Sequence, residues 1–537
     1  MHETTRRKRH DTGLRVAGLA LLAACGRNPG ADGPPHIVLI SIDTLRADHL
    51  SCYGYGRATS PRIDALARAG VRFERALSPT SWTLPAHVTM LTGLPISAHG
   101  ACDDRLWDRR DARGERIPPP LRARWVSEDL AAAGYRTGGF YSWKYLDDQF
   151  GFGAGFEVWE RPVHDFFSHP VVGAEYLRLK AAGDVEGQKA LAREHTELLD
   201  PARRSTPGTV DRALEWLAGV RAETPEAPVF LFLHLFDAHD PYLPPKAFDR
   251  FADPEYGGEI DGTRVTSPDS PVRADMSAAD LERLVSLYDG GIAWVDSEVG
   301  RFLDRLAALG LEDDTLVVVT SDHGEEFFEH GHKTHRRQLY MESLHVPLLM
   351  RWPGVLPRGR AVSGTVGLVD LAPTLRAAAG LAASGPTLGS DLLPFARGSA
   401  NPARTYVALL NLFEGGELSE RQVGLCRGDE LSIFVARPGG ARTERFDLAA
   451  NARGAGAGSV AEGEAAERWP DENLARWRDA VARLRARLPE RGSALPALSE
   501  LDKSQLAALG YGGLEAPTES AADSERLCVD GCVWRRD

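Results

Sequence analysis

The chain has few cysteines and no recurring basic stripe, and each lack argues against one common class of protein. Six cysteines are spread over 537 residues, which is too few for a fold held together by disulfide bonds, and no spacing matches a zinc ribbon. The net charge is −13, and no basic stripe recurs along the chain. Nucleic acid is therefore excluded as the main partner.

The N-terminus lacks an apolar run long enough to cross a membrane. Its apolar stretch at 16–24 is shorter than the about 20 residues that span a bilayer. The stretch follows the basic run RRKR at 6–9, and this order is typical of a secretory signal. The signal ends in LAACG at 22–26, which resembles the bacterial lipobox, in which Cys25 becomes the lipidated first residue. The alternative is an ordinary signal peptide with a chance cysteine.

A lipidated Cys25 predicts that the mature chain is exported across the inner membrane. It would be anchored through this lipid in the bacterial envelope, in the periplasm or at the outer membrane. Residues 1–25 are then the signal peptide. The glycine- and proline-rich residues 26–35 are a flexible tether.

Three apolar runs lack the alternation of half-exposed strands. Such runs are typical of strands buried on both faces of a parallel sheet, and they lie at 36–42, 229–236 and 315–320. The polar residues that follow them are Asp43 after the first run, Asp237 and His239 after the second, and Asp322 and His323 after the third. Because ligands bind at the carboxyl ends of strands in open α/β sheets, we expect these side chains to meet at one edge.

Two carboxylates and an imidazole form a ligand set suited to a divalent cation. Asp43, Asp322 and His323 supply this set. Taken singly, Asp43 could cap a helix and 322–324 could form a turn. The pairing of both segments at strand ends favours a metal site.

Helices are predicted between the strands. Ser277 and Asp280 form a capping box before an apolar-periodic stretch that runs to Leu309. Gly310 suits the end of that helix. Residues 171–204 are charged and locally helical, and we interpret them as an insertion over the site.

The composition changes after about residue 400. The apolar segments 423–426 and 431–436 flank a turn and predict a hairpin. Asp471 is predicted to cap a helix with one apolar face. These elements predict a smaller C-terminal subdomain.

The combined motifs resemble those of the sulfatases of the alkaline-phosphatase superfamily. Asp43 matches the first Asp of a metal-binding pair, and Thr44 occupies the position of the second. The matching segments are 36–54, 83–93, 232–245, 317–331, 339–354, 446–448 and 506–511. The resemblance covers nearly the whole mature chain.

The resemblance implies an alkaline-phosphatase-like α/β/α sandwich. We expect a large mixed, mostly parallel sheet in a catalytic domain at 36–395. An α+β subdomain with a small antiparallel sheet and a helix follows at 396–513, and a tail at 514–537.

The resemblance also implies roles for individual residues. The implied catalytic residues are Thr83, His87 and His239; the substrate-binding residues are Lys144, His335 and Arg336; and the metal ligands are Asp43, Thr83, Asp322 and His323. Thr83 stands at the position of the family's nucleophile.

Thr83 lies two residues before Pro85, which suits the first turn of a helix. Backbone N–H groups there favour a bound oxyanion, and a metal-bound threonine hydroxyl can ionise near neutral pH. The alternative is that Thr83 only caps the helix, as threonine does well.

Four positions depart from the family pattern. Sulfatases carry a Cys or Ser that is converted to formylglycine, and Thr83 cannot follow that route. The Arg four residues later is His87, the Lys-Trp-His triplet reads SWK at 142–144, and the metal-site Asn is His323. An imidazole moves the preference from Ca²⁺ toward Zn²⁺ or Mn²⁺. Superfamily relatives with a Thr nucleophile are phosphodiesterases, phosphomutases and phosphoethanolamine transferases.

The sequence therefore predicts a metal-dependent hydrolase or transferase that acts on sulfate or phosphate esters through Thr83, with phosphate favoured. Its substrate would be a small-molecule, glycan or lipid ester, and its cofactor a divalent cation (Zn, Mn, Mg or Ca, with Zn or Mn favoured). The alternative is a catalytically silent lipoprotein that binds sulfated or phosphorylated glycans. Such a protein would not need a nucleophile beside metal ligands.

Overall fold

The computed structural model describes most of the chain between residues 33 and 449. The described residues are 33–102, 124–163, 169, 171–195, 205–267, 269–382, 387–414, 417–449, 459–462, 479–484 and 486–487. The predicted signal peptide, most of the tether, the segment 506–511 and the tail lie outside them, as does most of the helix predicted after Asp471. Over the ranges just given, no helix is both long enough and apolar enough to span a bilayer.

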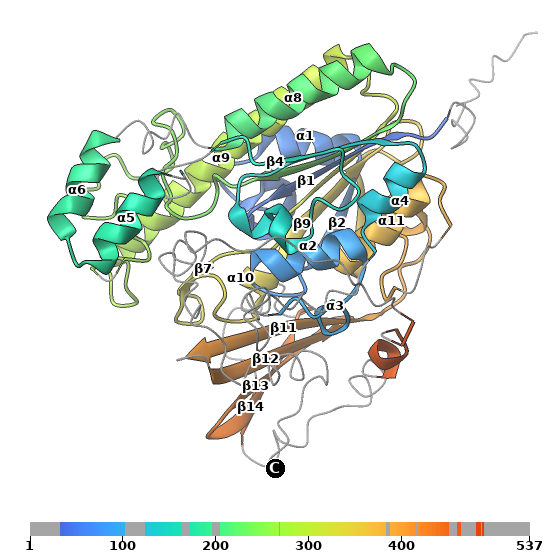
Figure 1. The fold of residues 1–537 in the computed structure, drawn as a ribbon. Helices are drawn as coiled ribbons and strands as arrows, with labels where there is room; N and C mark the ends of the chain where they lie inside the picture. Colours follow the sequence, from blue (N-terminus) through green and yellow to red (C-terminus); the bar gives the residue numbers. More distant parts are fainter. Residues whose placement is uncertain are drawn as a thin grey trace, which may run out of the picture.

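An eight-stranded sheet forms the middle layer of the larger part of the molecule (Figure 1). Its order is β10-β2-β9-β6-β1-β5-β3-β4. All neighbours are parallel except β9, which is antiparallel to β2 and β6. The strands are β1 (His36–Ile42), β2 (Val71–Leu77), β3 (Arg136–Phe140), β4 (Val158–Glu160), β5 (Val229–Leu235), β6 (Thr315–Thr320), β9 (His345–Arg351) and β10 (Arg360–Gly367). The predicted mixed, mostly parallel sheet is confirmed.

The three strands predicted from their apolar runs lie side by side at the centre of this sheet. Strand β1 pairs with β5 on one side and with β6 on the other. Ile42 is level with Leu235, and Ser41 is level with Thr320. The residues that follow the three strands therefore meet at one edge, as expected for the carboxyl ends of parallel strands.

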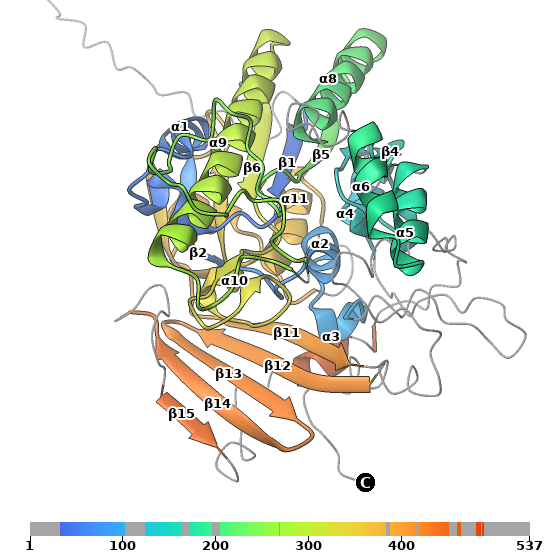
Figure 2. The same ribbon diagram turned by 90° about the vertical axis from the view of Figure 1, so that its left-hand side faces the viewer.

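Helices cover both faces of the sheet, because alternate side chains of a buried strand point to opposite faces and both need apolar cover. One hydrophobic core joins the sheet to α1, α8 and α9, and another joins it to α2, α4 and α11 (Figures 1 and 2). These helices are α1 (Pro61–Ala69), α2 (Thr83–Thr92), α4 (Val126–Ala132), α8 (Ser205–Glu223), α9 (Ala278–Ala308) and α11 (Leu371–Ala378). The capping box of α9 is confirmed, since the Ser277 hydroxyl accepts from the Asp280 N–H.

Shorter elements connect these layers. They are α3 (Ile96–His99), α5 (Val172–Ala181), α6 (Val185–Glu194), α10 (Met341–Leu344), α12 (Leu393–Arg397), β7 (Glu326–Phe327), β8 (Lys333–Thr334) and the 3-10 helices η1 (Ala47–His49), η2 (Ser51–Tyr53), η4 (Lys144–Leu146), η5 (Asp148–Phe150) and η7 (Leu368–Asp370). Helices α5 and α6 pack against each other and project from one side of the molecule (Figure 1). They confirm the helical character predicted for the part of 171–204 that the structure describes, residues 171–195. A position over the site stays a prediction.

A second, antiparallel sheet follows the first domain. Its strands pair in chain order and are β11 (Thr405–Glu414), β12 (Glu417–Arg427), β13 (Glu430–Arg437), β14 (Gly440–Asp447) and β15 (Ser459–Glu462). Cys426 pairs with Leu431, which confirms the hairpin predicted around this turn. The sheet lies beneath α3 and α10 (Figure 2). The predicted boundary at 395/396 falls inside α12.

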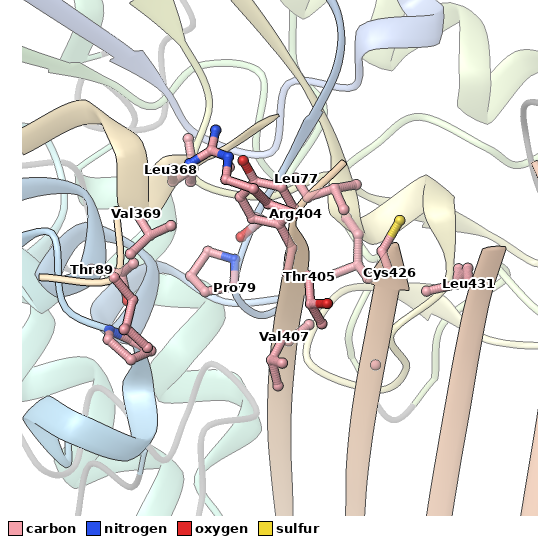
Figure 3. Close-up of a pocket in the computed structure, with 18 of the residues that line it drawn as sticks. Leu77, Pro79, Thr89, Leu368, Val369, Arg404, Thr405, Val407, Cys426 and Leu431 are labelled. Atoms are coloured by element: carbon pink, nitrogen blue, oxygen red, sulfur yellow. The ribbon is translucent and has the colours of Figure 1, made fainter. Parts of the chain in front are cut away.

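The seam between the two sheets holds a largely apolar pocket of about 270 Å³ (Figure 3). Leu77, Val369, Val407 and Leu431 contribute to its lining. None of the predicted catalytic or metal-binding residues lines it. The chemistry predicted from the sequence therefore belongs to the other region, at the carboxyl edge of the large sheet.

Candidate active site

Four side chains predicted as metal ligands come together from separate segments of the chain. Asp43 follows β1, Thr83 begins α2, and Asp322 and His323 follow β6. Thr83 Oγ1 lies 3.5 Å from Asp43 Oδ2 and 3.5 Å from His323 Nε2. His323 Nε2 lies 3.7 Å from Asp43 Oδ1 and 3.5 Å from Asp322 Oδ2. Each of the four residues is at most 1% exposed.

These spacings and the state of the ligand atoms fit a divalent cation. The ligands of a tetrahedral ion, bound at about 2.1 Å, are about 3.4 Å apart. Asp43 Oδ1 and Asp322 Oδ2 are buried without a hydrogen-bond partner among the described residues, which is costly for a carboxylate unless a cation compensates. His323 Nδ1 donates to the Gly324 carbonyl at 2.8 Å, so His323 Nε2 presents its lone pair to the cluster.

Backbone groups hold Asp322 in place. The N–H groups of Thr44 and His323 donate to Asp322 Oδ1 at 3.3 and 2.9 Å. Thr44 has a φ of 58°, a left-handed conformation that is unfavourable for a β-branched residue and typical of functional sites. Its hydroxyl donates to the Asp43 carbonyl at 2.8 Å. Thr44 thus contributes a backbone donor at the position where the family pattern has a second Asp.

The pKa values of the two carboxyl groups in the cluster are shifted in opposite directions. Burial and the charge of Asp43 raise the pKa of Asp322 to about 6. Burial also acts to raise the pKa of Asp43, but the hydrogen bond from His234 and the charge of His239 outweigh it, so this pKa is lowered. Without a cation, ionising both buried carboxyl groups is unfavourable, and a bound cation would offset that cost.

Thr83 is the first residue of α2 and does not cap it. Trp82 occupies the N-cap position, and no side chain makes a cap hydrogen bond there. The interpretation of Thr83 as only a helix cap is therefore wrong. The first turn of a helix carries N–H groups without partners inside the helix and a partial positive charge. Both favour an anion beside the Thr83 hydroxyl.

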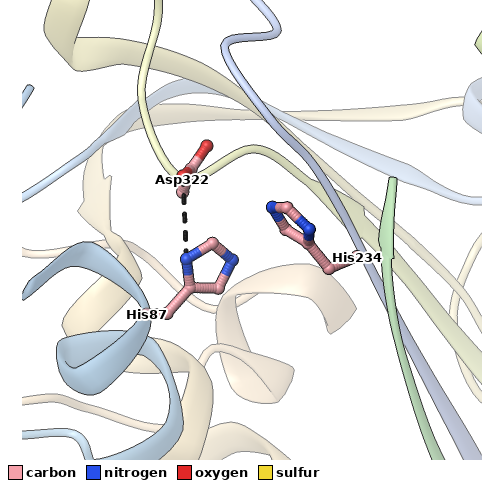
Figure 4. Close-up of side chains that lie close together, drawn as sticks. All are labelled: His87, His234 and Asp322. Atoms are coloured by element: carbon pink, nitrogen blue, oxygen red, sulfur yellow. Dashed lines mark ion pairs between the residues drawn. The ribbon is translucent and has the colours of Figure 1, made fainter. Parts of the chain in front are cut away.

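The structure adds His234, a residue that was not predicted. The Ser142 N–H donates to His234 Nδ1 at 3.4 Å, so the ring proton is on Nε2. His234 Nε2 donates to Asp43 Oδ2 at 3.1 Å and so orients a candidate metal ligand. Figure 4 shows His234 on β5 and His87 on α2 approaching Asp322. The sequence signal that could have identified His234 is its position as a histidine inside the apolar run of β5.

Replacing His234 with alanine is expected to weaken metal binding by about 10- to 100-fold, because Asp43 loses the hydrogen bond that orients it. Calorimetric titration of Zn²⁺ or Mn²⁺ into the metal-free protein measures this affinity. His99→Gln is the matched control, since His99 is also buried and bonds Thr89 near the end of α2 and not a candidate ligand of the cation. Equal affinities in His234→Ala and the wild type would contradict the orienting role.

His87 connects α2 to the sheet. Its Nδ1 donates to the Thr83 carbonyl at 2.9 Å, and its Nε2 accepts from Ser41 Oγ at 2.9 Å. Burial and the neighbouring His234 lower the pKa of His87 to about 3, so the ring is neutral near pH 7. These contacts hold the first turn of α2 in place, and the catalytic role of His87 stays a prediction.

His239 and His335 lie next to the first cluster. The ring centroid of His335 is 4.6 Å from that of His323 and 4.8 Å from that of His239. His239, Asp240 and His335 each offer a ligand atom, and these atoms lie within 4.8 Å of one another. Asp240 was not predicted as a site residue.

Lys144 and Arg336 flank this region. Lys144 is buried beside Trp143, with Nζ 5.9 Å from the ring centroid, and the Trp143 ring centroid is 6.0 Å from that of His239. Arg336 stacks over Trp82, the residue before Thr83, at 4.1 Å from its ring centroid. Both cations adjoin the site, and their roles in substrate binding stay predictions.

Two residues from the predicted segments do not join the site. Asp237 accepts hydrogen bonds from Ser205 Oγ at 3.0 Å and from Trp294 Nε1 at 3.1 Å, which connects β5 to α8 and α9. His330 bonds Glu342 Oε1 at 2.6 Å and stacks on Tyr340. Both are structural contacts.

Comparison with known proteins gives a consistent assignment. The family model described as Sulfatase matches residues 35–381. The chain is 27% identical to human arylsulfatase A over 72% of each chain. It is 24% identical to an arylsulfatase of Clostridium perfringens over 64% of this chain and 74% of that protein.

Solved structures share the fold. A phosphonate monoester hydrolase of Agrobacterium radiobacter is similar with a TM-score of 0.59 and 22% identity, over 84% of this chain and 95% of that chain. The predicted alkaline-phosphatase-like sandwich is thereby confirmed. With its fold, its metal-binding geometry and a family match over most of the described chain, this protein belongs to the sulfatase family of ester hydrolases.

Proposed function

We propose that this enzyme hydrolyses phosphate esters in preference to sulfate esters, with Thr83 as its nucleophile. The observation that carries the proposal is the position of Thr83 Oγ1, 3.5 Å from Asp43 Oδ2 and 3.5 Å from His323 Nε2. A hydroxyl among metal ligands at the start of a helix has both a means of ionisation and a place for the anion that it attacks.

Asp43, Asp322 and His323 would hold the cation together with Thr83. An imidazole among the ligands favours Zn²⁺ or Mn²⁺ over Ca²⁺, which takes six to eight oxygen ligands. A bound divalent cation lowers the pKa of a coordinated hydroxyl and neutralises charge on the ester oxygens.

Hydrolysis would then proceed by a double displacement at phosphorus, in which the side chains have separate roles. Thr83 loses its proton to solvent, and its Oγ1 attacks phosphorus while the bond to the leaving oxygen breaks; the leaving oxygen takes a proton from solvent. Water next attacks the phosphothreonine at phosphorus and releases Thr83 and inorganic phosphate. The first turn of α2 supplies N–H donors to the ester oxygens. Lys144 and Arg336 add positive charge nearby.

The absence of formylglycine favours phosphate over sulfate. Family members with formylglycine release sulfate by elimination from an aldehyde hydrate, and threonine has no such route. Phosphoryl transfer proceeds well when positive charge neutralises the equatorial oxygens. The phosphonate monoester hydrolase of Agrobacterium radiobacter supports the view that this fold accommodates cleavage at phosphorus.

The test is a matched panel of nitrophenyl phosphate monoester, phosphate diester and sulfate ester, assayed after metal analysis of the purified protein. We expect at least tenfold faster turnover of a phosphate ester, without co-expression of a formylglycine-generating enzyme. Turnover of the sulfate alone would contradict the proposal. Binding of sulfated or phosphorylated glycans without any turnover would favour the silent lipoprotein instead.

The chain is further proposed to be anchored through a lipid on Cys25. The LAACG motif at 22–26 supports this, and the disulfide bond of Cys102 fits an oxidising compartment outside the cytoplasm. Gly26 lacks the acidic residue that retains many lipoproteins in the inner membrane, which favours the outer membrane.

Replacing Cys25 with serine is expected to give an unprocessed or soluble protein, whereas the wild type partitions into detergent, because acyl chains contribute about 0.8 kcal/mol per buried CH₂. Detergent-phase partitioning and the mass of the mature N-terminus measure this. A Cys52→Ser variant, in which a free cysteine is replaced, is the control. Unchanged processing and membrane association of Cys25→Ser would rule out the lipid anchor.

A further inference from the structure

The tether enters the large sheet at the end opposite to the Thr83 site. Strand β1 runs from His36 to Ile42, and Asp43 follows it directly. The other candidate ligands on the sheet follow β6, which is parallel to β1, so the site lies at the carboxyl ends of these strands. At about 3.3 Å per residue, β1 separates the tether from the site by about 23 Å. Figures 1 and 2 show α2, which Thr83 begins, between β1 and the antiparallel sheet.

Hydrogen bonds to both neighbouring strands fix the point at which the tether enters. The His36 N–H donates to the carbonyl of Asp314, just before β6, at 3.0 Å. The N–H of Val229, the first residue of β5, donates to His36 Nδ1 at 3.1 Å. Burial lowers the pKa of His36 to about 4, so the ring is neutral near pH 7 and Nδ1 is able to accept. The tether therefore begins at the amino ends of the central strands and cannot slide along the sheet.

The described part of the tether is not packed against the side of the sheet. Gly33 and Pro34 are exposed, and Pro35 is half-buried. No atom of the described residues lies within 4 Å of where a Cβ at Gly33 would be. The two prolines also restrict the backbone to extended conformations. The chain thus leaves the domain where β1 begins and does not run back toward the Thr83 site.

The tether is short compared with the domain that it carries. Ten residues, 26–35, separate Cys25 from His36. Their reach is at most about 35 Å when fully extended and typically about 17 Å as a flexible chain. A compact unit of about 400 residues has a radius of gyration of about 21 Å, and half a circumference at that radius is about 65 Å. A tether of this length cannot pass around the domain to bring the opposite end of the sheet to the membrane.

We propose that the Thr83 site faces away from the membrane in which Cys25 is anchored, and that its substrate is a water-soluble phosphate ester. The inference rests on the lipid anchor and the phosphate ester hydrolysis proposed above. With the amino ends of the strands nearest the membrane, the site is held at least the length of β1 above the lipid headgroups. A phospholipid of the anchoring membrane is therefore out of reach, whereas an ester dissolved in the surrounding compartment has free access.

The test is the distance of each end of the sheet from the membrane. The full-length lipoprotein is inserted into liposomes that contain an acceptor-labelled lipid, with a donor fluorophore on a non-natural residue at Asp313 or, separately, at Arg337. Both positions are exposed; Asp313 precedes β6, and Arg337 follows Arg336, which stacks over Trp82. Energy transfer is expected to be several-fold more efficient from position 313.

The Cys25→Ser variant carrying the same fluorophores is the control, and it is expected to lose energy transfer from both positions. Equal transfer from the two positions of the anchored protein, or greater transfer from 337, would overturn the proposed orientation. The absence of transfer from both would refute the lipid anchor and this inference together.

A longer tether tests the cause of the orientation. Inserting about 40 glycine and serine residues after Ala31 raises the fully extended reach to about 170 Å, which is enough to pass around the domain. The difference between positions 313 and 337 is then expected to shrink. An unchanged difference would show that the length of the tether does not orient the domain, and would overturn the argument.

The substrate class is tested on the wild type with phosphatidic acid, a lipid that is itself a phosphate monoester. We expect hydrolysis of a dissolved short-chain form and loss of turnover when a long-chain form is in the anchoring liposome. Equal rates on the two forms would overturn the proposal. Energy transfer does not use turnover, so a protein with the expected orientation that hydrolyses no nitrophenyl phosphate would refute the proposed function and leave the orientation standing.

Discussion

Replacing Thr83 with alanine is expected to lower the rate of phosphate ester hydrolysis by about 10⁴-fold or more, the scale seen when a nucleophile is removed. The change removes the attacking oxygen and one ligand of the cation together. Alanine is smaller and a good helix former, so α2 is expected to stay folded. Initial rates with nitrophenyl phosphate, alongside a thermal melt and metal analysis, measure the effect.

Thr83→Ser is the matched control, because it keeps the hydroxyl and removes only a methyl group. We expect it to retain most of the activity. Acid quenching of the wild type during turnover should trap a phosphothreonine at residue 83, visible by mass spectrometry, and the resting enzyme should show unmodified Thr83. If Thr83→Ala keeps full activity, the threonine mechanism is wrong.

Replacing Asp322 with asparagine is expected to lose the bound cation and essentially all turnover. Asp322 Oδ2 faces His323 Nε2 at 3.5 Å without a hydrogen bond, and an amide there is a far weaker ligand than a carboxylate. Loss of the cation also removes its stabilisation of the folded state, which is about 4 kcal/mol when the free ion is at 1,000 times its Kd. Chelation of the wild type should lower Tm, and added Zn²⁺ or Mn²⁺ should restore it.

Asp289→Asn is the control for a general effect of losing a buried carboxylate. Asp289 is as buried as Asp322, but it pairs with His49 and Arg57 in another part of the fold. This variant is expected to lose stability and keep its metal. Full metal content and activity in Asp322→Asn would contradict the site as described.

The central strands were predictable because the hydrophobic pattern that specifies them lies within short runs of consecutive residues. The runs at 36–42, 229–236 and 315–320 are apolar at consecutive positions, and only burial on both faces accommodates such runs as strands. Their carboxyl ends then had to meet at one edge. The prediction of Asp43, Asp322 and His323 as candidate metal ligands followed from this rule and from their chemistry, and the structure brings the three side chains together.

The residues that support the ligands were not predictable in the same way. His234 and Asp43 are 191 positions apart, and nothing near either residue indicates the other. The same holds for Glu325, whose Oε1 lies 3.0 Å from His335 Nδ1, because this contact depends on the register of a hairpin of two-residue strands. Such strands carry no periodic pattern from which pairing could be inferred.

The sequence by itself predicted the buried central strands and the candidate ligands at their ends, because hydrophobic pattern and residue chemistry act along the chain. Its resemblance to the sulfatases predicted the mixed, mostly parallel sheet and the family. Only the tertiary structure decided that Thr83 begins α2 instead of capping it, and which imidazole nitrogens are available to a cation. The free nitrogen of His323 is assigned by a hydrogen bond to the adjacent Gly324, whereas the ring of His234 is assigned by Ser142, which is 92 positions away. The proton on a histidine ring follows the group that faces it, and that group is chosen by the fold.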